Sequence, residues 1–185
     1  MIETRWEMKR NVLNTTLSLL AVLFTVQALC ISAPSQQKAS QVMELMQEGS
    51  AHYLRGDFKK AIGPYQKALD LEKQKRTLEH NLWRVLVDNL GMSYGISGNL
   101  KVAKDTFEYG VSEDPEYPMF YYNVACTYGE MDNMEKAIDY LRLAFARKDN
   151  MIPGEKFPDP ARDSSFARFA DNEKFKAALK EMKEK

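Results

Sequence analysis

One arrangement of small and large residues recurs three times along this 185-residue chain, and it limits the fold more than any other feature. Each stretch has an alanine at the equivalent place, at Ala61, Ala103 and Ala137. Ala103 and Ala137 are 34 residues apart, whereas Ala61 and Ala103 are 42 apart. Self-similarity at a period of roughly 20 to 50 residues is typical of proteins in which one supersecondary unit stacks on the next.

Each stretch has the pattern of two antiparallel helices joined by a turn. The turns contain glycine, aspartate or asparagine, which favour turns over helices. They are Arg55-Gly56-Asp57, Ser97-Gly98-Asn99 and Met131-Asp132-Asn133. Gly91 and Ala125 are small enough to let the two helices approach closely. Phe107 and Leu141 are large and fill the space between neighbours. The sequence therefore predicts an all-α fold.

The second stretch carries the fullest version of the pattern. Its residues are Leu90-Gly91, Tyr94, Gly98, Ala103, Phe107, Gly110 and Pro115. On these residues the chain resembles the tetratricopeptide repeat family. The third stretch is similar, and the first has His52 where the family usually has an aromatic residue. The resemblance covers residues 42–151, as repeats 42–75, 84–117 and 118–151. It implies a right-handed superhelical stack of helix-turn-helix repeats, with a groove along the first helix of each repeat.

Eight extra residues separate the first two repeats. They fall within Leu71–Leu82, a segment without glycine or proline. Because nothing there breaks a helix, we expect the two flanking helices to be longer by about one turn each.

Residues 152–185 form the predicted capping segment. Prolines bound two turns, at Ile152-Pro153-Gly154 and Phe157-Pro158-Asp159-Pro160. Apolar residues then follow at helix-compatible spacing: Phe166, Phe169, Phe175, Leu179 and Met182. An open stack of helix pairs leaves its last apolar face bare, and a terminal helix with a polar outer side covers it. A docking helix for another protein is the alternative interpretation.

Residues 1–33 have the three parts of a secretory signal peptide: basic residues, an apolar centre from Leu17 to Val26, and small residues at the exit. Cleavage after Ala28 or after Ala33 fits this pattern. An uncleaved membrane anchor over residues 12–31 is an alternative, because that stretch reaches the length of a membrane span. Acylation of Cys30 is a further alternative, although Leu29 before it is larger than a lipobox prefers.

The polar residues 34–41 are predicted to link this segment to the repeats. Together, these features predict an exported protein that is periplasmic or secreted, or one anchored in the inner membrane by residues 12–31. Contact with a membrane is then expected only through the N-terminal segment.

Composition and motifs argue against several classes of function. Lys and Arg total 26, and so do Asp and Glu, so the chain lacks the basic surplus of a nucleic-acid binder. The two histidines, His52 and His80, have no neighbours at metal-ligand spacing. Cys126 lies among apolar residues, where a thiol is normally inert. No nucleophile, zinc or phosphate-loop motif is present. We therefore expect no catalytic site, no cofactor and no metal.

The resemblance also implies which residues face the groove. At the sixth place of each repeat stand Gln47, Asn89 and Asn123, and such amides can hold the backbone of a bound peptide because they both donate and accept. Four further candidates are Met46, Asp88, Met92 and Tyr122. The alternative is that the amides solvate the helix surface and that each methionine is core packing.

Two functions follow from this reading. The first is an adaptor or scaffold of the cell envelope that binds a peptide or helix of a partner protein in the groove. The second is a structural subunit of an envelope assembly, or a homo-oligomer, formed by edge-to-edge packing of repeats. The partner is not identified by the sequence.

Overall fold

The computed structural model describes residues 34–184, which form helices and loops without a strand. The chain divides into two compact units, residues 1–39 and residues 40–185. Only the start of one helix is described in the first unit, so the account below concerns the second. The predicted signal peptide, the alternative anchor, both cleavage sites and Cys30 lie outside the described residues.

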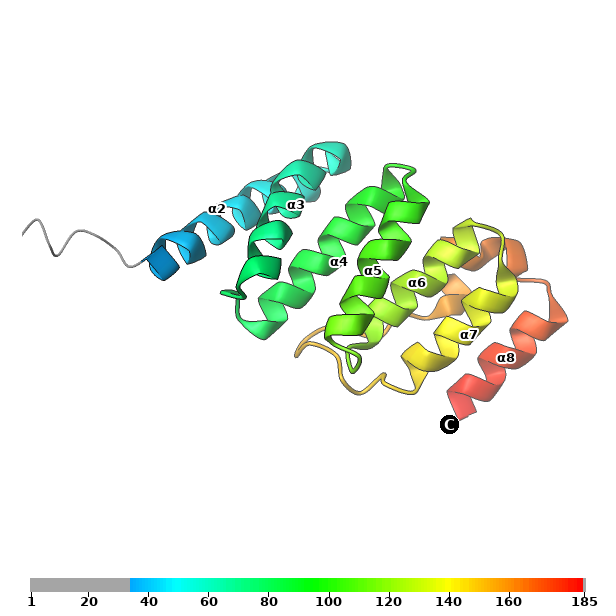
Figure 1. Cartoon of the computed structure of the whole chain (residues 1–185). Coiled ribbons are helices and arrows are strands. Elements are labelled where there is room, and N and C mark those ends of the chain that lie inside the picture. Colours follow the sequence, from blue (N-terminus) through cyan, green and yellow to red (C-terminus); the bar gives the residue numbers. More distant parts are fainter. Residues whose placement is uncertain (1–33, 185) are drawn as a thin grey trace, which may run out of the picture. The chain divides into compact units, whose positions relative to one another are not determined.

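Three pairs of antiparallel helices follow one another, and each corresponds to a predicted repeat (Figure 1). They are α2 (Pro34–Leu54) with α3 (Phe58–Gln74), α4 (His80–Ile96) with α5 (Leu100–Glu113), and α6 (Pro118–Glu130) with α7 (Met134–Phe145). Two short 3₁₀ segments follow, η1 (Pro160–Arg162) and η2 (Ser164–Phe169), and α8 (Glu173–Glu184) ends the chain. From α3 to α7, each helix packs against the next in sequence.

The structure differs from the prediction at residues 34–41, which form the first turns of α2 and not a linker. Proline is favourable in the first turn of a helix, where its missing N–H has no intrahelical partner in any case. The residues that follow Pro34 are Ser, Gln, Lys and Ala, which an exposed helix tolerates well. A polar composition alone therefore did not distinguish a linker from a solvated helix.

Aromatic rings of one helix pack directly against glycines of the preceding helix. A Cβ atom added at Gly49 would lie 2.6 Å from the ring of Tyr65, and one at Gly91 would lie 2.4 Å from that of Phe107. Both rings are buried. The small residues of the repeat pattern thus allow the contact between the two helices of a repeat, as the sequence predicts.

The turn inside each repeat contains one residue in the left-handed region. These are Gly56, Gly98 and Asp132, with φ of 77°, 89° and 59°. The three positions are equivalent, since they are separated by 42 and 34 residues. Glycine adopts this conformation without steric cost, and aspartate tolerates it better than most residues.

The extra residues between the first two repeats are divided between helices and a loop. α3 has 17 residues against 14 in α5, and α4 has 17 against 13 in α6. Each helix is longer by about one turn, as expected. The remaining residues 75–79 form a loop around the buried carboxylate of Glu72, which accepts hydrogen bonds from the backbone N–H of Thr77 at 2.9 Å and of Leu78 at 3.1 Å.

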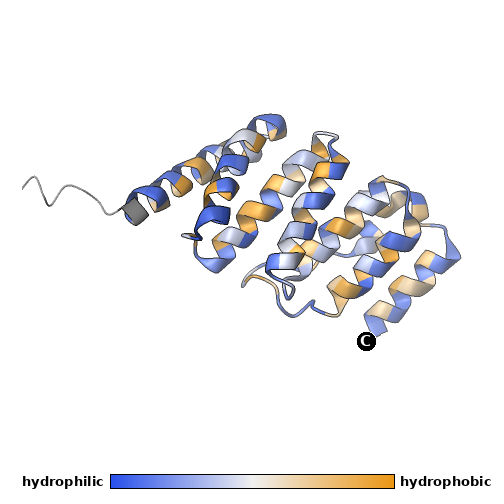
Figure 2. Cartoon of the chain, in the orientation of Figure 1, coloured by the Kyte–Doolittle hydropathy of each residue, from blue (hydrophilic) through white to orange (hydrophobic). Residues whose placement is uncertain are grey.

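Apolar and polar residues alternate along the helices so that each helix buries one side (Figure 2). The last repeat and the C-terminal segment share one apolar cluster. The five predicted capping residues, Phe166, Phe169, Phe175, Leu179 and Met182, are all buried in it. The first two belong to η2 and the other three to α8. The C-terminal segment therefore covers the last repeat, as a cap does.

We predict that Gly91→Ala destabilises the fold by about 1–3 kcal/mol, because the added methyl group would overlap the buried ring of Phe107. Gly95→Ala is the matched control one turn later. Its Cβ would lie 3.6 Å from Ala103, an ordinary contact, so it should leave stability unchanged or raise it by up to about 1 kcal/mol. Urea unfolding of both variants measures the difference, and equal stability would contradict the packing argument.

Candidate functional site

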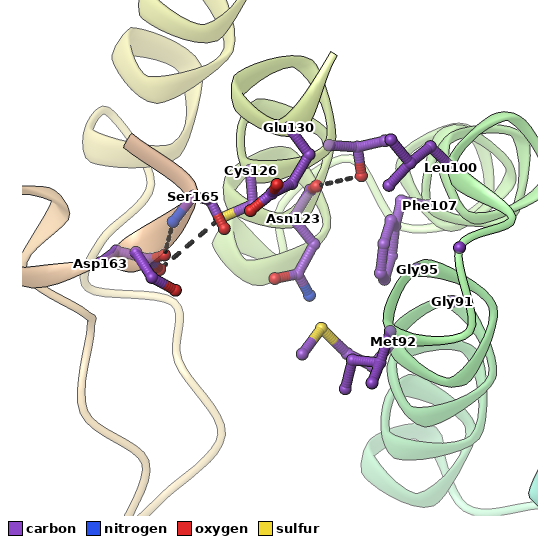
Figure 3. A pocket seen from close by; sticks show the side chains of 14 residues that line it. Gly91, Met92, Gly95, Leu100, Phe107, Asn123, Cys126, Glu130, Asp163 and Ser165 are labelled. Atoms are coloured by element: carbon purple, nitrogen blue, oxygen red, sulfur yellow. Dashed lines mark hydrogen bonds between the residues drawn. The ribbon is translucent and has the colours of Figure 1, made fainter. Parts of the chain in front are cut away.

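A pocket of about 630 Å³ lies between the first helices of the second and third repeats. α4 and α6 form its two sides, Phe107 of α5 contributes to the lining, and part of η2 closes one side (Figure 3). The lining residues are Gly91, Met92, Gly95, Ile96, Gly98, Leu100, Phe107, Asn123, Cys126, Thr127, Glu130, Asp163, Ser164 and Ser165. The pocket therefore lies on the first helices, where the repeat pattern predicts the groove.

Equivalent residues of the second and third repeats stand on its two sides. Met92 and Gly95 of α4 correspond to Cys126 and Gly129 of α6, at the 34-residue period. Because a helix repeats its faces in a fixed register, these positions present the same side of each helix. The two sides can thus be compared residue by residue.

On α6 this side is covered by the chain's own C-terminal segment. After α7, the chain crosses α6 before it reaches η2 and α8 (Figure 1). The ring of Phe157 packs edge-on against Tyr122 at 5.6 Å between centroids, and the Tyr122 hydroxyl donates to Asp163 at 2.9 Å. The carbonyl oxygen of Ser165 lies where a Cβ of Gly129 would come within 2.4 Å of it. The C-terminal segment thus covers Tyr122 and Gly129 of the third repeat, whereas Cys126 still lines the pocket.

The two asparagines predicted to hold a ligand both make internal hydrogen bonds. Asn123 is 5% exposed, and its amide donates to the carboxylate of Asp88. The amide of Asn89 donates to the hydroxyl of Tyr65 at 3.2 Å. These bonds join α6 to α4 and α4 to α3.

The other predicted groove residues lie in different surroundings. Met46 belongs to the apolar core, and Tyr122 is buried beneath the C-terminal segment. Gln47 is exposed on α2. Met92 lines the pocket. Of the predicted set, the pocket itself brings together only Met92 and Asn123.

Asp88 is the most perturbed acid of the site. It is half-buried on α4, and burial raises its pKa to about 7, with a further increase from the negative charge of Glu155. The hydrogen bond from Asn123 opposes this shift because it stabilises the ionised carboxylate. No basic side chain of the described residues lies within ion-pair distance of Asp88, so nothing there neutralises its charge.

Several residues of the site were absent from the sequence-based prediction. Gly95 and Ile96 stand at pocket positions on α4, and the 34-residue register with α6 is the signal that would have found them. Asp163 and Ser165 come from the C-terminal segment, and their position depends on a long connection whose path no local pattern indicates.

Within residues 34–184, no group of three or more His, Cys, Asp or Glu side chains is placed to hold a metal ion. Burial and the neighbouring Asp163 raise the pKa of the Cys126 thiol well above its usual range, so the thiol form dominates at neutral pH. None of the helices in this part of the chain is both long and apolar enough to cross a membrane.

We predict that Asp88→Asn makes stability less dependent on pH. The pKa of Asp88 is raised from 3.8 to about 7 in the folded state, so the wild type should lose stability as pH rises between these two values. Asparagine can still accept the hydrogen bond from Asn123 but cannot ionise. Urea unfolding at pH 5 and pH 8 measures this effect. The free energy of unfolding of the variant, relative to that of the wild type, should be higher at pH 8 than at pH 5. A constant difference at the two pH values would contradict the assignment.

A family model for the tetratricopeptide repeat matches residues 120–150, which span the helix pair α6 and α7 with its turn. Among solved structures, the crystal structure of PcrH from Pseudomonas aeruginosa is similar, with a TM-score of 0.51 and 19% sequence identity. The similarity covers 78% of this chain and 92% of that one, and at this identity it concerns the fold. No curated protein matches the chain. The helix pair α6 and α7 is thus matched as a tetratricopeptide repeat, and the stack of paired helices around it is similar in fold to PcrH.

Proposed function

We propose that this protein is a non-catalytic scaffold that binds a segment of a partner protein on the exposed first helices of its first two repeats. The observation that carries this proposal is the asymmetry of the site. On α6 the chain's own C-terminal segment covers Tyr122 and Gly129, whereas the equivalent face of α4 borders an open pocket.

Exposed apolar side chains support binding beside this pocket. Ile96 lines the pocket and is 52% exposed. Leu54 stands at the equivalent place of the first repeat, 42 residues earlier, and is 84% exposed. Water-exposed apolar side chains that recur at one place in successive repeats favour a surface that a partner covers.

The internal hydrogen bonds of Asn89 and Asn123 change the expected mode of binding. Because both amides are engaged with side chains of this protein, they fix the relative positions of the helices that border the pocket. The partner is then held mainly by apolar contacts with Met92 and Ile96 and by the charge of Asp88. A preformed pocket of this kind needs little rearrangement on binding.

The proposal also places the protein in the cell envelope. It rests here on the order of basic, apolar and small residues in residues 1–33, which is typical of a secretory signal. The partner is then an exported or envelope protein.

We predict that Ile96→Glu abolishes capture of a partner from an envelope extract by the full chain. A charge at this exposed place should not disturb the core, but it would have to be desolvated beneath an apolar partner surface. Val102→Glu is the matched control, because Val102 is a β-branched residue of α5 that is 42% exposed and does not line the pocket.

Loss of the same protein with Ile96→Glu, and its retention with Val102→Glu, would support the proposal. Equal capture by both variants would contradict it. Sedimentation of the wild type over a range of concentrations tests the alternative, because a homo-oligomer would show self-association that Ile96→Glu leaves unchanged.

A further inference from the structure

The C-terminal segment shows how a first helix of this fold receives another piece of chain. On α6 it contacts the fifth, ninth and twelfth places of the repeat. The hydroxyl of Tyr122 donates to Asp163, the thiol of Cys126 lies 3.7 Å from the same carboxylate, and the backbone of Ser165 lies against Gly129. This contact is an intramolecular example of ligand binding.

The corresponding places on α4 are not covered by the C-terminal segment in this way: Met92 and Gly95 line the pocket, and Asp88 is half-buried one turn before Met92. The fifth, ninth and twelfth places of the second repeat are Asp88, Met92 and Gly95. A Cβ added at Gly95 would meet nothing closer than Ala103 at 3.6 Å, whereas one at Gly129 would overlap the carbonyl oxygen of Ser165. Gly95, like Gly129, leaves room for a backbone to approach the helix closely. At Gly129 the backbone of Ser165 occupies this room, whereas at Gly95 it is unoccupied.

The two faces differ in the polarity of the fifth place. Tyr122 presents a hydrogen-bond donor to the carboxylate of Asp163, whereas Asp88 presents an acceptor that carries a negative charge when ionised. The residues lining the pocket include two carboxylates and no Lys or Arg. Arg84, one turn before Asp88, is held by Asp114 at 2.6 Å. Charge complementarity at α4 thus favours a cation where the C-terminal segment has an anion.

We propose that the face of α4 formed by Asp88, Met92 and Gly95 receives a turn of a partner protein in the way that α6 receives residues 157–166, with a basic side chain of the partner against Asp88. An apolar side chain next to that base enters the pocket beside Met92. This inference rests on the proposed function and adds the chemistry of the bound segment.

The titration of Asp88 should make the binding of a basic ligand depend on pH. The groups that face it are Tyr53 from α2, Tyr117 just before α6, Asn123 from α6, and Glu155 from the segment after α7. None of them is basic. With a pKa of about 7, Asp88 is mostly protonated at pH 6 and mostly ionised at pH 8. A basic ligand should therefore bind more tightly at pH 8, since it favours the ionised form.

Two synthetic peptides test the inference on the full chain. One has the sequence of residues 156–169, and the other is the same peptide with Asp163→Lys. We expect the lysine peptide to bind at least about tenfold more tightly than the unchanged peptide at pH 8, with a smaller ratio at pH 6. In the protein, Asp88→Asn should remove the preference and Asp88→Lys should reverse it. Isothermal titration calorimetry measures each affinity.

Gly95→Ala separates binding from folding. It adds one methyl group where the partner's backbone would approach, so it should weaken the lysine peptide by about tenfold or more while the protein remains as stable as the wild type. Val102→Ala on α5 is the control and should leave the affinity unchanged.

A lysine peptide that does not bind, that binds no better than the unchanged peptide, or that is insensitive to Asp88→Asn and Gly95→Ala would overturn the inference. The capture experiment with Ile96→Glu is independent of these peptides. Loss of capture there together with no peptide preference would retain the proposed function and reject only the basic ligand.

Discussion

The fold depends on the close contact between a glycine on one helix and an aromatic ring on the next. At Gly49 and Gly91 the ring occupies the space that a Cβ would need, so the two helices of a repeat approach more closely than larger residues would allow. Gly129 uses the same lack of a side chain for a different neighbour, the backbone of Ser165. A glycine on the first helix thus allows the helix contact in the first two repeats, and in the third repeat it allows the contact with the C-terminal segment.

That contact determines where a partner can bind. Residues 157–166 cover Tyr122 and Gly129 on α6, whereas Met92 and Gly95 on α4 line the open pocket. The partly buried hydrogen bond between Asn123 and Asp88 joins these two helices, and no basic side chain of the described residues pairs with the carboxylate. The site therefore combines apolar surface at Met92 and Ile96 with an acid whose pKa is raised, which gives it a chemical preference as well as a shape.

Most of the fold could be predicted from the repeat period. The spacing of Ala103 and Ala137, and the turn residues near Gly98 and Asp132, predicted the helix pairs because each position has a fixed packing or backbone role. The site was less predictable. The sequence predicts that Asn89 and Asn123 face a ligand, but each donates a hydrogen bond to a side chain of this protein. Such a bond depends on which side chains the neighbouring helices bring close. The sequence-based prediction of a linker at the start of α2 is wrong because polarity does not distinguish a loop from an exposed helix.

The central claim is that a partner covers the face of α4 and leaves the C-terminal segment in place on α6. Methyl NMR of the full chain, labelled at methionine and titrated with the captured partner, tests it most directly. The account predicts that the resonance of Met92 in the pocket shifts on binding, whereas that of Met182, on the buried side of α8, does not. Shifts at Met182 with none at Met92 would show that the partner binds at the cap, and would contradict the account.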